Sequence, residues 1–318
     1  TDVAEKARRN HTEPARETIA QGLIDESGFY RALAAEMGLA FLAQPPPLKP
    51  GGGHDAILRQ GIAPTDGDAR FRFILAPEGP SLRRMLEAGP RDRDDIAVTT
   101  PRDFGDALRR SNAEGLAEHA AGLDPAGLER DSARTGASRG QGIAAGCGVS
   151  AAAIGAVFAP LETFFGLALL LGPLFLGLIL LRLAASLERT APDLWRSHRW
   201  RIDDARLPVY TVAVPLYREL AVLRQLTDAL SALDYPAAKL DIRLLIEADD
   251  TAMSGALAQM ALPPHFCVTV VPPGFPRTKP RALNLALLEA RGTLFTIYDA
   301  EDIPDPQQLR MAAARFLR

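Results

Sequence analysis

The sequence predicts an α/β protein with a membrane-spanning segment, and two features of its pattern support this. After residue 205, short apolar segments alternate with helical ones, which indicates a parallel sheet with crossover helices. Between residues 143 and 181, the apolar stretch contains Glu162 as its one side chain of clear charge. The parts expected are a small α+β domain with a linker at 1–138, a transmembrane hairpin at 143–183, and an α/β domain at 184–318 that is incomplete at its C-terminus.

The overall charge argues against one class of function. The chain has 36 Lys and Arg residues against 39 Asp and Glu residues, which gives a net charge of −3. Proteins that bind nucleic acids normally carry a strongly basic surface. We therefore expect no nucleic acid among the partners of this protein.

The N-terminal part predicts helices, a loop and at least one strand. Residues 13–43 have helical spacing of apolar side chains, with a break at Gly22. The segment PPPLKPGGGHD is typical of a loop, and RFRFILAPEG predicts a strand that runs into a turn. Thr100 and Pro101 suit the N-cap and the first position of a helix. The polar stretch before residue 143 predicts a tether.

The long apolar stretch predicts two membrane spans joined by a turn. One span needs roughly 20 apolar residues, and this stretch has about twice that number. Pro160 and Glu162 suit the turn, so the spans are expected at about 143–160 and 164–182. Arg139 and Arg182 flank the pair, which places both flanking parts in the cytoplasm by the positive-inside rule. Two alternatives are a buried hairpin of a soluble protein and a single span that leaves the N-terminal part outside.

Two acidic clusters end predicted strands of the last part. The strands expected are YTVAVP, DIRLLIEADD, FCVTVVPP and LFTIYDAED. The clusters are Glu247 with Asp249 and Asp250, and Asp299 with Glu301 and Asp302. Ligands of open parallel sheets bind outside the carboxyl ends of the strands. The clusters therefore lie where a functional site is expected, although Asp and Pro also favour a plain turn.

The second cluster suits a divalent cation. In an extended chain, Asp299 and Glu301 point to the same side, and the small Ala300 leaves space between them. Two such carboxylates repel one another unless a cation binds, and Mg²⁺ or Mn²⁺ prefers oxygen ligands completed by substrate phosphates. Lys279, at the start of a predicted helix, suits a diphosphate, and Asp249 suits a base or ribose hydroxyl. An ordinary exposed lysine is the alternative for Lys279.

Four segments in order resemble the membrane-bound glycosyltransferases of family 2, which are related to the cellulose synthases. They are LPVYTVAVPLYRE, LDYPAAKLDIRLLIEADD, PRTKPRALNLAL and ARGTLFTIYDAEDIPDPQQL, and they cover about residues 205–318. The resemblance implies a GT-A (Rossmann-like) fold. It also implies an inverting enzyme that binds a nucleotide-diphosphate sugar, most often a UDP-sugar, with Mg²⁺ or Mn²⁺.

The resemblance also assigns roles to individual residues. The substrate-binding residues it implies are Pro215 and Glu219 at the nucleotide, Asp249 with its neighbours Glu247 and Asp250, and Lys279 with Asn284 near the diphosphate. The metal ligands it implies are Asp299 and Glu301, assisted by Asp302. Glu301 stands where the family has a second Asp, which changes the geometry more than the ability to bind. The family's catalytic base follows in a later acidic element, so we expect a longer native chain and no activity from these residues alone.

The expected function is transfer of a sugar to a surface glycan or exopolysaccharide at the inner membrane of a bacterium. The alternative is a non-catalytic membrane receptor or scaffold. That alternative draws on residues 20–43, which resemble the N-terminal domain of type II secretion ATPases, a module that binds cyclic di-GMP in some proteins. The first half of the module's nucleotide-binding pattern is not evident in this chain, and a docking domain is the other interpretation.

Overall fold

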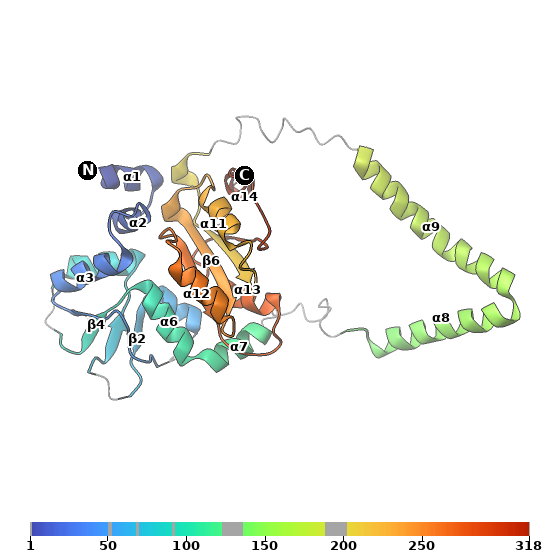
Figure 1. The fold of residues 1–318 in the computed structure, drawn as a ribbon, viewed down its shortest axis with the longest axis horizontal. Coiled ribbons are helices and arrows are strands. Elements are labelled where there is room, and N and C mark those ends of the chain that lie inside the picture. The colour runs from blue at the N-terminus through green and yellow to red at the C-terminus, as the bar shows by residue number, and fades with distance from the viewer. Residues whose placement is uncertain are drawn as a thin grey trace. The chain divides into compact units, whose positions relative to one another are not determined.

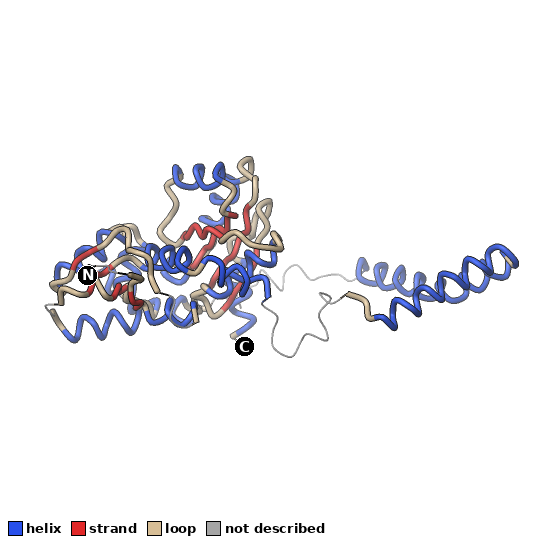
Figure 2. Tube along the Cα trace, turned by 90° about the horizontal axis from the view of Figure 1, so that it is seen from below, coloured by secondary structure: helices blue, strands red, loops and turns tan. Residues whose placement is uncertain are grey.

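The computed structural model describes residues 2–49, 53–67, 70–90, 93–122, 136–187 and 202–317. These residues form two compact units (Figure 1; Figure 2). One unit combines residues 2–122 with residues 202–317, and the other contains residues 136–187. Most of the predicted tether, at 123–135, lies outside the described residues.

The C-terminal part of the first unit is built on a parallel sheet of four strands in the order β7-β6-β5-β8. The strands are β5 (Tyr210–Leu216), β6 (Leu240–Glu247), β7 (Phe266–Val271) and β8 (Leu294–Ile297). The 3-10 turn η3 (Asp204–Arg206) precedes them, and the helices and 3-10 turn that connect or follow them are α11 (Leu223–Ser231), η4 (Ala237–Lys239), α12 (Thr251–Gln259), α13 (Lys279–Leu288) and α14 (Gln308–Phe316). The predicted α/β alternation is confirmed.

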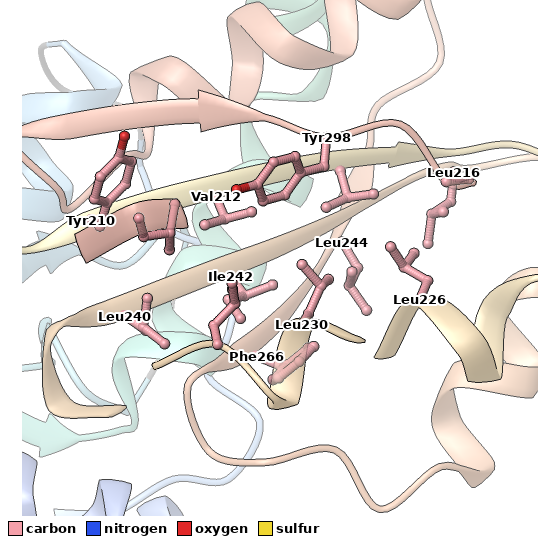
Figure 3. Close-up of a cluster of buried hydrophobic side chains, with 14 of the residues drawn as sticks. Tyr210, Val212, Leu216, Leu226, Leu230, Leu240, Ile242, Leu244, Phe266 and Tyr298 are labelled. Carbon is pink, nitrogen blue, oxygen red and sulfur yellow. The ribbon is translucent and has the colours of Figure 1, made fainter. Parts of the chain in front are cut away.

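Alternation along the strands divides the core between the two faces of this sheet. On β6, Ile242 and Leu244 face one side, where Leu226 and Leu230 of α11 pack against them (Figure 3). Leu245, the neighbour of Leu244, faces the other side. Because β-strand side chains have a period of two, one strand serves both layers. Each fully buried Leu or Ile contributes roughly 1.5–3 kcal/mol.

The N-terminal part of this unit has its own small sheet, in the order β1-β4-β3-β2. Its elements are α1 (Asp2–Asn10), α2 (Pro14–Ala20), α3 (Glu26–Glu36), β1 (Ala40–Phe41), α4 (His54–Gln60), β2 (Ile62–Pro64), β3 (Phe73–Leu75), α5 (Gly79–Ala88), β4 (Ile96–Val98), α6 (Pro101–Ser111) and α7 (Ala113–Gly122). Thr100 caps α6 by accepting a hydrogen bond of 3.0 Å from the Asp103 amide, which confirms the predicted helix start. We call residues 2–122 the N-terminal module.

The second unit is a pair of helices, α8 (Arg139–Phe158) and α9 (Pro160–Leu187), with the break at Ala159. Both are long and apolar enough to cross a membrane, by length and composition only. Ser138 and Gln141 form a reciprocal capping box at the start of α8. The second helix begins at Pro160 and ends at Leu187, so it is longer at both ends than the predicted span of 164–182.

A buried ion cluster joins the N-terminal module to the C-terminal part. Glu289, directly after α13, accepts hydrogen bonds from Arg109 of α6 at 2.6 Å and from Arg243 of β6 at 2.8 Å. His54 of α4 lies 3.0 Å from the other carboxylate oxygen, and the Glu289 side chain is 1% exposed. Burial by itself would raise the pKa of Glu289, but Arg109, His54 and Arg243 outweigh it and lower the pKa to about 2. The module is thus held against the sheet by charges that water does not screen.

We expect Glu289→Gln to destabilise the first unit by up to roughly 3–5 kcal/mol, because it removes the buried charge that two guanidinium groups share and leaves Arg109 with Asp106 and Arg243 with Asp241 alone. The measurement is urea unfolding in detergent, followed by circular dichroism. A depressed carboxyl pKa stabilises the folded state above the ordinary value of 4.5 and loses this effect as the pH falls toward about 2. The difference between parent and variant should therefore shrink over that range.

The matched control is Glu118→Gln on the exposed face of α7, which should change stability by no more than about 0.5 kcal/mol. If Glu289→Gln were as mild as this control, the ion cluster would not be what holds the module in place.

Candidate functional site

The predicted site residues gather at the carboxyl edge of the parallel sheet. Pro215 lies near the end of β5, Glu247 ends β6, and the second acidic cluster follows β8. The loop between β7 and α13, residues 272–278, borders the same edge, and we call it the β7–α13 loop. Three strand ends and one loop therefore supply the side chains of the site.

Lys279 is the first residue of α13, as the sequence predicts, and its ammonium group forms an ion pair with Asp299. The two side chains are 44% and 52% exposed. An exposed pair of this kind contributes only about 0–1 kcal/mol. Either partner can therefore exchange the other for a ligand of higher charge, such as a phosphate or a divalent cation.

Arg277 forms a second exposed ion pair, with Asp249, at 2.7 Å between Nη1 and Oδ2. The sequence analysis did not single out Arg277. In the sequence, its position two residues before Lys279 was the feature that could have pointed to it. Arg277 of the β7–α13 loop thus pairs with an acid that follows β6. Lys279, directly after the loop, pairs with an acid that follows β8.

Asp250 is a buried structural residue of the site. Its carboxylate accepts hydrogen bonds from the amide of Met253, which caps α12, and from the amide of Arg218 at 2.6 Å. Arg218 has φ of +58°, a left-handed conformation that is costly for a residue with a side chain. Asp250 therefore fixes the loop after β5, which carries Glu219.

The Glu247 side chain is also held in place, by a hydrogen bond from a buried arginine. It accepts a hydrogen bond of 2.7 Å from Arg281 of α13, and Arg281 donates another of 2.7 Å to the carbonyl of Pro272. Arg281 is 2% exposed and was missed by the sequence analysis, since its burial depends on tertiary packing. Asn284, on the same helix, donates to the carbonyl of Ala120 in α7 at 2.7 Å.

The segment after β8 contains both the turn and the carboxylates that the sequence left as alternatives. Asp302 accepts a hydrogen bond of 2.8 Å from the Asp299 amide, and its own amide donates to the Asp299 carbonyl. Asp302 thus closes a turn, while Asp299 and Glu301 remain exposed at the strand end. The segment is therefore both a turn and an exposed pair of carboxylates.

Comparisons with known proteins find a family to which this part of the chain is similar. Residues 208–318 match the family model described as glycosyltransferase like family 2. The "Probable glycosyltransferase YdaM" of Bacillus subtilis is 28% identical over 109 residues, which are 34% of this chain and 26% of that protein. Residues 208–318 are thus similar to family 2 glycosyltransferases, and we refer to them below as the family 2 domain. The chain spans about a quarter of the length of this curated relative.

Two solved structures are similar to part of this chain. The mannosyltransferase PcManGT from Pyrobaculum calidifontis, in complex with GDP-Man and Mn²⁺, is 27% identical over 47% of this chain and 43% of that one, with a TM-score of 0.35. TarS 1–349 of S. aureus, in complex with UDP-GlcNAc, is 24% identical over 33% of this chain and 30% of that one, with a TM-score of 0.26. The parallel sheet with its crossover helices gives this part of the chain an α/β fold.

The acids of the family 2 domain fit a cation that is completed by ligand oxygens. Oε2 of Glu219 is buried and has no hydrogen-bond partner among the described residues. Burial raises the pKa of Glu219, the nearby charge of Glu301 raises it further, and Lys279 opposes both. Within the described residues, no three His, Cys, Asp or Glu side chains are grouped to hold a metal ion. A divalent cation at this edge would have one or two carboxylate ligands and would complete its shell with oxygens of a bound ligand.

We expect substitutions around Glu219 to shift its pKa in opposite directions. Glu301→Gln removes a neighbouring negative charge and should lower the pKa, whereas Lys279→Met removes a positive charge and should raise it. The measurement is a carboxyl NMR titration of Glu219 in each variant. Asp228→Asn, on the exposed face of α11, is the control and should leave the titration unchanged. Shifts of the same sign in both site variants would contradict this geometry.

Proposed function

We propose that the family 2 domain binds a nucleotide-diphosphate sugar together with Mg²⁺ or Mn²⁺ and transfers its sugar to an acceptor. One observation carries the proposal. The exposed cations Arg277 and Lys279 and the acids Asp249, Asp299 and Glu301 share one edge of the sheet, where they are paired only weakly with one another. Groups of both signs in exchangeable pairs suit a ligand that brings phosphates and a cation together.

Each side chain has a role in this proposal. Asp299 and Glu301 hold the cation, and Lys279 with the first turn of α13 binds the diphosphate. Asp249 exchanges Arg277 for a hydroxyl or base of the nucleotide, while Pro215 and Glu219 line the pocket. The bound cation neutralises charge that develops on the leaving diphosphate. Glu247, Asp250 and Asn284 support these groups from below.

The finer features of the proposal follow the expected family pattern. The donor is a UDP-sugar, the transfer inverts the anomeric centre, and the acceptor is a surface polysaccharide or another surface glycan. The helices α8 and α9 cross the lipid bilayer of a bacterial inner membrane, with both flanking parts in the cytoplasm. Their length and apolar composition, with Arg139 and Arg182 near the two outer ends, support this arrangement.

A second candidate function is a non-catalytic membrane receptor or scaffold in which the N-terminal module binds a nucleotide such as cyclic di-GMP. One observation favours it. A cavity of about 610 Å³ lies between the module and the amino ends of the strands, lined by Arg16 and Arg102 of the module and by Lys239 and Arg291 of the C-terminal part. Its lining cations already have partners, for example Arg291 with Glu78 at 3.0 Å. Binding of a nucleotide sugar at the opposite, carboxyl edge of the sheet distinguishes the two candidate functions.

We expect the double variant Asp299→Asn with Glu301→Gln to lose Mn²⁺-dependent donor binding. Removal of both carboxylate charges leaves the cation without protein ligands of the right charge, so affinity should fall at least about tenfold, or roughly 1.4 kcal/mol. The measurement is calorimetric titration with UDP-GlcNAc and with GDP-mannose, each with and without Mn²⁺.

The matched control changes two exposed acids away from this edge, Asp228→Asn with Glu118→Gln, and should bind as the parent does. If the site variant bound the donor as tightly as the parent, the proposed metal ligands would be wrong. A parent that binds neither donor but does bind cyclic di-GMP would favour the receptor instead.

A further inference from the structure

Helix α7 of the N-terminal module packs directly on α13, the helix that begins with Lys279 (Figure 1). Leu116 and Ala120 of α7 share a buried cluster with Leu285 and Ala286 of α13. This cluster fills the face of the parallel sheet opposite to the one that α11 covers. The module therefore supplies part of the core beneath the candidate site.

A hydrogen bond joins the two helices at the end of α7. Ala120 lies in the last turn of α7, where backbone carbonyls have no partner within the helix. Asn284 donates its side-chain amide to the Ala120 carbonyl at 2.7 Å. In this structure the Asn284 amide is thus directed at α7 and fixes α13 in rotation and along its axis.

A second contact lies under the β7–α13 loop. A Cβ added to Gly274 would lie 2.7 Å from Cβ of Ala117 in α7 and 3.0 Å from Nη1 of Arg281. Cβ atoms essentially never approach to 2.7 Å, so this loop lies on α7 without room for one more carbon. Arg281 also holds this loop by donating a hydrogen bond to the Pro272 carbonyl.

We propose that α7 positions the β7–α13 loop at the donor site, and that Gly274 and Asn284 are the positioning residues through which it acts. Gly274 lies three residues before Arg277 and five before Lys279, so a shift at this point moves both cations. The N-terminal module is then part of the donor site, although none of its side chains needs to touch the donor. The consequence for the donor rests on the proposed function, whereas the effect on the loop does not.

Gly274→Ala tests the close contact, in the full chain in detergent. It should speed hydrogen exchange of residues 272–279 and weaken Mn²⁺-dependent binding of UDP-GlcNAc or GDP-mannose by about tenfold or more, because the cations are displaced. Ala117→Gly in the same chain removes the opposing Cβ and should restore both measurements. The control, Gly255→Ala in α12, adds a Cβ that has nothing within 4 Å and should change neither.

Asn284→Ala provides a second variant that introduces no clash, and it should change exchange and binding in the same direction. Exchange and affinity are compared well below the melting temperature of each variant, so a general loss of stability does not imitate the effect. The proposal is overturned if Gly274→Ala and Asn284→Ala leave exchange of the loop unchanged, or if Ala117→Gly fails to restore it.

The two proposals fail in distinguishable ways. If the parent binds no nucleotide sugar, the proposed function fails, and hydrogen exchange alone still decides whether α7 positions the loop. If the parent binds donor and the variants loosen the loop without any loss of affinity, the positioning role is overturned while the proposed function remains.

Discussion

The buried carboxylate of Glu289 is the point on which the arrangement of the first unit depends. It forms ion pairs with Arg109 of the module and Arg243 of the sheet at once, in a buried place where Asp106 and Asp241 supply the rest of the counter-charge. Glu289 directly follows α13, and Lys279 begins that helix. Helix α13 therefore extends from the ion cluster, where the two parts meet, to the sheet edge where the site lies. Its position is set by charge at one end and by packing against α7 along its length.

The polar groups of the site differ in how firmly they are held. Glu247 with Arg281, and Asp250 with the backbone of Arg218, are largely buried contacts that shape the loops. The pairs of Lys279 with Asp299 and of Arg277 with Asp249 are exposed, so they are weak and exchangeable. The buried contacts thus support the exposed side chains, whose partners can change. A binding site for charged ligands requires such an arrangement.

Local patterns in the sequence were sufficient to predict the elements of the C-terminal part, and they failed where contacts are distant. The strands β5 to β8 follow from short apolar runs, and the start of α13 at Lys279 follows from its local motif. Arg109 and Glu289 are 180 positions apart, so no local signal could pair them. Asn284 shows the same limit. Its motif implies a place near the diphosphate, and no local pattern predicts that its amide bonds to a helix 164 residues away.

The most direct test of this account is a crystal structure of the chain with Mn²⁺ and a nucleotide-diphosphate sugar, with the metal located by its anomalous scattering. The account predicts one Mn²⁺ peak between the carboxylates of Asp299 and Glu301 and the diphosphate, with Lys279 moved from Asp299 to a phosphate oxygen. A peak elsewhere, or a donor bound with the pair of Lys279 and Asp299 intact, would contradict it.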